Sequence, residues 1–159
     1  MTGRRRAASI PMMVNTSFDA SQSPPIPERT ELTAFYWDAV DAHRLELLRC
    51  RGCGHFVHYP RAICNRCLGT DLAPEEVSGR GTLYSYCEIM QASHPYFLDR
   101  LPYLIGIIDL DEEPGVRIPT GIVECTADEL RCGIAMEVVF VEVTPTLTLP
   151  YFRPVRGDT

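Results

Sequence analysis

The chain has 159 residues, near the usual size of one domain, so it holds one core or two very small modules and excludes a large multidomain enzyme. With 45% hydrophobic and 23% charged residues it has a soluble, globular composition, and no apolar run reaches the roughly 18 residues that span a bilayer. Its formal net charge of -6 repels polyanions and so disfavours generic nucleic-acid binding.

Residues 1–28 are predicted to form a flexible tail. A polar run over residues 15–23 and the prolines within residues 24–27 bury too little apolar surface to offset the entropy of ordering them. The basic start at residues 4–6 precedes an apolar stretch that is too short and too broken for a secretory signal. We therefore expect a cytoplasmic protein with no membrane partner.

Residues 29–73 are predicted to form a helix followed by a zinc ribbon. Over residues 31–42, apolar side chains recur at spacings of three and four, as in an amphipathic helix. Residues 44–49 are typical of a short strand, and residues 55–59 of its hairpin partner between two Cys-x-x-Cys pairs. This order of elements indicates a zinc ribbon.

Four of the seven cysteines are predicted to bind one structural zinc ion. They form two pairs separated by ten residues: Cys50 and Cys53, then Cys64 and Cys67. Thiolates from two such turns complete a tetrahedral zinc site, and a closed set of four leaves no position for water or substrate. Iron in the same ligand set is an alternative.

The remaining cysteines and the nearby histidines have other interpretations. His55 and His58 could replace a ligand, but with four cysteines already placed we interpret them as a turn residue and a strand residue. The other three cysteines are interpreted as small buried hydrophobic residues: Cys87, Cys125 and Cys132.

Residues 74–159 are predicted to form a five-stranded OB-fold barrel. The expected strands span residues 81–89, 103–110, 116–124, 136–144 and 147–152. The acidic stretch 111–115 is interpreted as a solvated hairpin loop, and residues 126–130 can form one helical turn before the fourth strand. Five strands with such an insertion match the OB-fold, so the chain as a whole is predicted to be mainly β.

The sequence contains no familiar catalytic motif. A glycine-rich phosphate loop, a Gly-x-Ser-x-Gly elbow and a His-Glu-x-x-His helix are all missing from it. Among the histidines, His94 has the sequence context best suited to a functional site, because Tyr96 and Phe97 follow it in a long loop. Loop histidines near aromatic residues are nevertheless more often surface or packing residues. The arginines are dispersed along the chain. A few of them could bind a nucleotide phosphate, and the others are interpreted as ordinary surface charges.

Several segments together resemble a known family. They are Phe35-Tyr36-Trp37, Arg44 to Leu47, Cys50 to Gly54, Tyr59-Pro60-Arg61, Cys64 to Cys67, Gly79 to Ser85, Pro102-Tyr103 and Phe152 to Pro154. This order is similar to the zinc-ribbon plus OB-fold family, long catalogued as a domain of unknown function and found beside thiolase-type genes. The resemblance covers about residues 30 to 155 and implies a rubredoxin-like ribbon. Asn65, where the family often has proline, and the acidic loop depart from the pattern.

The resemblance implies a non-catalytic accessory subunit in lipid or steroid metabolism. Similar proteins partner thiolase-fold or lipid-transfer-protein-type enzymes in hetero-oligomers, namely acetyltransferases, hydroxymethylglutaryl-CoA synthases and steroid side-chain retro-aldolases. It further implies acyl-CoA as a ligand. The candidate residues for contact with CoA or the partner are Arg61, His94, Tyr96, Phe97 and Arg117.

Three alternatives stay open. Zinc ribbons and OB-folds also bind single-stranded nucleic acid, although the many acidic residues of the barrel half oppose it. A self-sufficient acyl-CoA hydrolase or lyase would use His94 with an acid such as Asp99. A purely structural scaffold would bind no CoA at all.

Overall fold

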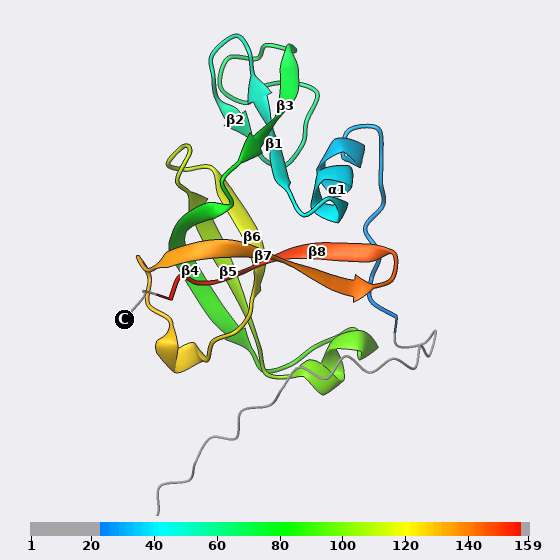
Figure 1. Ribbon diagram of the computed structural model, residues 1–159, viewed down its shortest axis with the longest axis vertical. Coiled ribbons are helices and arrows are strands. Elements are labelled where there is room, and N and C mark those ends of the chain that lie inside the picture. The colour runs from blue at the N-terminus through cyan, green and yellow to red at the C-terminus, as the bar shows by residue number, and fades with distance from the viewer. Residues whose placement is uncertain (1–22, 157–159) are drawn as a thin grey trace, which may run out of the picture.

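The computed structural model describes residues 23–156, which form a zinc-ribbon-like unit above a β-barrel (Figure 1). Most of the predicted tail, residues 1–22, lies outside the described residues. Residues 23–30 are described and contain neither helix nor strand. Within residues 23–156, none of the helices has the length and apolar character needed to cross a membrane.

Helix α1 spans Ala34–Asp41, inside the predicted range of 31–42. It starts late because residues 31–33 form a turn, in which the Thr30 amide donates to Thr33 Oγ1 at 2.9 Å. Ala39 and Val40 are buried, and the helix contacts strand β1 (Leu45–Cys50) of the ribbon and strand β8 (Leu147–Pro154) of the barrel. It therefore bridges the two parts of the molecule.

The ribbon is a three-stranded antiparallel sheet with the order β2-β1-β3. Strands β1 (Leu45–Cys50) and β2 (Phe56–Val57) lie where the sequence predicted a hairpin. Strand β3 (Leu72–Val77) was not predicted. It carries Pro74 and two glutamates, and such a segment is tolerated because β3 is an edge strand that pairs only with β1.

The barrel has five strands, as predicted, and closes in the order β4-β5-β6-β8-β7. The strands are β4 (Arg80–Ile89), β5 (Tyr103–Leu110), β6 (Arg117–Ile122), β7 (Ala135–Thr144) and β8 (Leu147–Pro154). Only β6 and β8 pair in parallel, and the short helix η3 (Ala127–Glu129) lies between β6 and β7. This is the predicted OB-fold.

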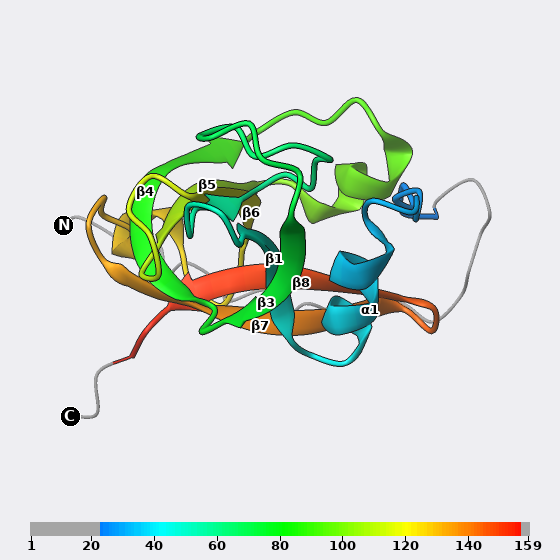
Figure 2. The same ribbon diagram turned by 90° about the horizontal axis from the view of Figure 1, so that it is seen from above.

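One apolar core joins ribbon and barrel. Inside the barrel, Leu83, Ile108 and Phe152 are completely buried. The same cluster extends upward to Leu45 and Leu47 on β1, which lies with β3 over the barrel and beside α1 (Figure 2). Because the apolar contact is continuous, the ribbon and the barrel are held as one packed unit.

Candidate functional site

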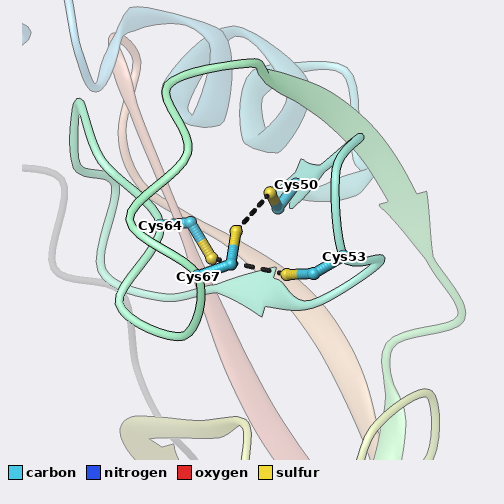
Figure 3. A group of neighbouring side chains, drawn as sticks. All are labelled: Cys50, Cys53, Cys64 and Cys67. Carbon is cyan, nitrogen blue, oxygen red and sulfur yellow. Dashed lines mark hydrogen bonds between the residues drawn. The ribbon is translucent and has the colours of Figure 1, made fainter.

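The four predicted zinc ligands converge at the tip of the ribbon (Figure 3). All four sulfur atoms lie within 4.8 Å of one another. Across the cluster, the Cys50 and Cys67 sulfurs are 3.5 Å apart, and the Cys53 and Cys64 sulfurs are 3.7 Å apart. A compact set of four thiols is the donor chemistry that zinc prefers in structural sites.

Two similar turns build the cluster. In the first, the Gly54 amide donates to the Cys50 carbonyl at 2.7 Å, and in the second the Leu68 amide donates to the Cys64 carbonyl at 3.0 Å. Amides of the second turn also point at sulfur, since the amides of Cys67 and Arg66 hydrogen bond to the Cys64 thiolate and lower its pKa to about 6, against the effect of burial. The thiolate is the form that binds metal.

The three cysteines outside the cluster have different environments. Cys125 is half-buried, whereas Cys87 and Cys132 are exposed. The interpretation as buried hydrophobic residues is therefore wrong for Cys87 and Cys132, because β4 turns Cys87 outward and Cys132 follows η3 in a loop.

The acidic loop after β5 is an anchor between barrel and ribbon. Glu113 accepts a hydrogen bond from the Phe56 amide at 2.8 Å, lies 2.8 Å from His55 Nδ1 and 3.3 Å from Arg66 Nη1. Burial opposes its ionisation, but these contacts outweigh burial and lower the pKa of the carboxyl. The interpretation of the loop as a solvated turn is therefore wrong at Glu113. His55, which was interpreted as a turn residue, contacts the Glu113 carboxylate.

An aromatic cleft of about 320 Å³ lies between α1, the segment after β2, β6 and β8. Its walls are mainly aromatic and proline side chains: Tyr36, Trp37, Tyr59, Pro119, Pro150 and Tyr151. The Tyr151 ring lies against Gly121, where a built Cβ would approach the ring to 2.3 Å. Because Gly121 has no side chain, the Tyr151 ring can pack directly against β6 and form part of the cleft wall.

The polar groups of the aromatic cleft are neutral. Both ring nitrogens of His58 are buried without a hydrogen-bond partner in the described chain, and burial lowers the pKa of His58 to about 4. Burial, with a smaller effect of Tyr59, raises the pKa of Tyr36 to about 12. Burial also raises the pKa of Tyr151. At neutral pH the cleft is thus lined by uncharged hydrogen-bonding groups.

The loop residues predicted for CoA or partner contact lie together on the short helix η2 (Pro95–Arg100) and its cap. His94 caps this helix, and its Nδ1 accepts from the Tyr96 amide at 3.2 Å. Phe97 packs against Tyr96 and Tyr103, with ring centroids 5.0 and 5.4 Å away. Tyr96 is close enough to Tyr151 to contribute to its raised pKa.

The two predicted arginines do not join this group. Arg117 lies on the outside of the barrel, 3.5 Å above the Tyr84 ring and 3.6 Å from Asp109. Arg61 is exposed in the segment after β2. The structure therefore brings together only the η2 residues among the five candidates.

The cleft residues Tyr36, His58 and Tyr151 were not predicted as site residues. In the sequence, Tyr36 falls on the apolar face of the predicted helix, and His58 and Tyr151 fall in predicted strands. Each residue was therefore explained by its place in the fold, and none was considered for a site. Among the described residues, His94 makes no hydrogen bond or ion pair with Asp99, as the hydrolase alternative would require.

Comparisons with known protein families match both parts of the molecule. Residues 37–73 match the family described as ChsH2, rubredoxin-like zinc ribbon domain. Residues 74–141 match the family described as ChsH2, C-terminal OB-fold domain.

Curated relatives include proteins from bacteria and archaea. A probable enoyl-CoA hydratase alpha subunit of Thermomonospora curvata is 33% identical over 130 residues, which are 82% of this chain and 40% of that protein. The chain thus spans well under half of that relative. A DUF35 domain-containing scaffold protein of Methanocaldococcus jannaschii is 34% identical over 117 residues, 69% of this chain and 81% of that protein.

Two solved structures resemble the chain. One is described as Ltp2-ChsH2(DUF35) aldolase, with a TM-score of 0.73 and 32% identity, covering 81% of this chain and 98% of that chain. The other is a DUF35 protein of unknown function from Sulfolobus solfataricus, with a TM-score of 0.55 and 12% identity, covering 79% of this chain and 86% of that chain. The second likeness concerns the fold alone.

Proposed function

This chain belongs to the ChsH2, or DUF35, family of zinc-ribbon and OB-fold proteins, and we propose that it is a non-catalytic accessory subunit of a thiolase-superfamily acyl-CoA enzyme. The partner is a thiolase, a synthase or a steroid side-chain retro-aldolase, of thiolase-fold or lipid-transfer-protein type. The observation that carries the proposal is the likeness to a chain of an aldolase described as Ltp2-ChsH2(DUF35), over 98% of that chain.

The four clustered cysteines hold one structural zinc ion in this proposal. When bound, zinc would supply a cross-link between the two turns and no open coordination position for substrate. The Arg66 amide donates to the Cys64 sulfur at 3.4 Å, and such a donor stabilises the thiolate that this cross-link needs. The metal therefore stabilises the ribbon and takes no part in bond chemistry.

A division of labour between the two subunits makes physical sense. Among the described residues His94 has no acid partner, and His55 with Glu113 joins the ribbon to the barrel, so we assign the reacting groups for carbon-carbon bond chemistry to the enzyme partner. The accessory subunit covers the mouth of the partner's active site, excludes water and positions the acyl-CoA. The contact residues proposed for CoA or partner remain Arg61, Arg117 and the η2 residues.

The cellular setting and the division of the chain are part of the same proposal. We place the complex in the cytoplasm, where the ribbon thiols would stay reduced and free for metal. The division into a tail over residues 1–28, a helix with ribbon over 29–73 and a barrel over 74–159 also stays a prediction. Because β3 spans Leu72–Val77, the ribbon sheet continues across the expected boundary.

Enzyme turnover with and without this chain tests the proposal. The thiolase-like protein encoded nearest to it is purified alone and as a complex, and acyl-CoA cleavage or condensation is assayed in both. The accessory role predicts that the partner is inactive, unstable or strongly impaired alone, and that adding the chain restores turnover. Full turnover by the partner without the chain would refute the proposal.

A further inference from the structure

The aromatic cleft is large enough to hold a small ligand or part of a larger one. At about 320 Å³ it lies at the lower end of the roughly 300 to 1,000 Å³ common for ligand pockets. It is therefore too small for a whole acyl-CoA and large enough for one part of it. No arginine, aspartate or glutamate is among its lining residues. A group that carries phosphates would lose its hydration there without gaining a counter-charge.

The cleft is lined by polar as well as apolar side chains, and one of them, His58, has buried ring nitrogens. Neither ring nitrogen of His58 has a hydrogen-bond partner in the described part of the chain. A neutral imidazole offers one donor and one acceptor. Tyr36 and Tyr151, whose rings carry hydroxyl groups, also line the cleft, one from α1 and the other from β8. Such groups favour a ligand that is mostly apolar and carries an oxygen able to accept or donate a hydrogen bond.

We propose that the aromatic cleft binds the neutral acyl portion of an acyl thioester, a carbon chain or ring system bearing a carbonyl or hydroxyl oxygen. The nucleotide of the thioester stays outside the cleft, which has no arginine in its lining. This inference rests on the proposed function for its substrate class, and it adds the subsite and the residues that select the acyl group. Tyr36 and Tyr151 are positioning residues for the oxygen, and the rings of Trp37 and Tyr59 form the apolar wall.

The position of Trp37 makes the cleft directly observable. It is the single tryptophan of the chain and lines the cleft, so its fluorescence reports what enters. The full chain, loaded with zinc, is titrated with octanoyl-pantetheine, octanoyl-CoA and CoA. We expect saturable changes with the first two, with Kd values within about threefold of each other, and no change with CoA. An equal response to CoA alone would overturn the proposal, as would a response only to the enzyme partner and to neither octanoyl probe.

Single-hydroxyl variants separate the cleft from the outer surface. Tyr36→Phe and Tyr151→Phe each remove one hydroxyl and keep the ring, so we expect octanoyl-pantetheine to bind about three- to tenfold more weakly. Tyr84→Phe is the matched control, because Tyr84 lies under Arg117 outside the cleft, and its Kd should be unchanged. Unchanged Kd values for both cleft variants, with normal zinc content and thermal unfolding, would contradict the assignment.

A second variant blocks the cleft by shape. Gly121→Val places side-chain atoms where the Tyr151 ring now lies, and the ring is pushed from its place in the wall. Folded Gly121→Val protein should lose the Trp37 response to octanoyl-pantetheine, and a preserved response would count against the cleft. This titration needs no enzyme partner, so its failure is distinguishable from a failed turnover assay. If the probe binds but the chain has no effect on a partner, the proposed acyl subsite stands and the proposed accessory role is refuted.

Discussion

At the scale of single residues, the two cysteine turns both need a left-handed backbone at the position after the second cysteine. One turn has glycine at this position and the other has leucine. Gly54 has a φ of 75°, and Leu68, at the equivalent place in the second turn, has a φ of 62°. Leu68 is also 76% exposed, so its side chain gains little by packing. A left-handed backbone costs a side-chain-bearing residue about 1–2 kcal/mol, whereas glycine adopts it freely.

This difference predicts opposite effects of two exchanges. Leu68→Gly should raise the free energy of unfolding by about 0.5–1 kcal/mol, because the relieved strain exceeds the extra entropy of glycine in the unfolded chain. Gly54→Leu should lower it by about 1–2 kcal/mol. Urea denaturation in excess zinc measures both. Shifts of the same sign for the two variants would contradict the strain assigned to this position.

His58 should make stability depend on pH in a defined window. Its pKa is about 4 in the fold and ordinarily 6.5, so the unfolded chain takes up a proton first as pH falls. The stabilisation is complete above pH 6.5, and about 1.4 kcal/mol of it should be gone at pH 5.5. His58→Phe should remove this part of the loss between pH 7.5 and 5.5 in urea denaturation. An equal loss in both proteins would show that His58 is not held neutral, since the other histidines affect both alike.

At the scale of elements, the loop between β5 and β6 fixes the ribbon on the barrel. Glu113 reaches His55, the Phe56 amide and Arg66 across the joint. Glu113→Gln should lower the free energy of unfolding by about 1–3 kcal/mol, because a charge-assisted contact is replaced by a neutral one. Asp111→Asn is the control, since Asp111 is exposed in the same loop and should change stability little. Equal effects of the two exchanges would refute the anchoring role.

The ribbon itself should depend on metal. Cys53→Ser removes one of the four ligands, so we expect zinc content to fall from about one ion per chain to a small fraction, with loss of the ribbon's protection against proteolysis. Plasma emission spectrometry and limited trypsin digestion measure the two effects. Cys132→Ser, in an exposed loop outside the cluster, should retain full zinc. Full zinc in Cys53→Ser would exclude this residue as a ligand.

Local patterns made most of these elements predictable. The barrel strands are runs rich in apolar and β-branched residues that end at turn residues, and the cysteine spacing defines the metal site without any tertiary information. Strand β3 could not be found this way, because Pro74 and its glutamates hide a strand that exists only through pairing with β1. The anchor role of Glu113 was missed for a related reason, since an acidic hairpin loop is normally solvated and its partners are about 50 positions away.

At the scale of the whole molecule, the shared core makes helix, ribbon and barrel one unit with a cleft at their junction. The cleft was not predictable because α1, the segment after β2, β6 and β8 meet only in the folded chain. A unit packed around one core can present the cleft, the η2 helix and the ribbon together to a larger partner. Under the proposed accessory role, this arrangement would bring an acyl group in the cleft next to the enzyme partner.

Native mass spectrometry of the affinity-purified chain from its own host tests the central claim most directly. The account predicts a zinc-loaded hetero-oligomer in which the chain and a thiolase-superfamily enzyme occur in a fixed stoichiometric ratio. Recovery of the chain alone, at its own mass of 17.9 kDa, from cells that express such an enzyme would contradict it.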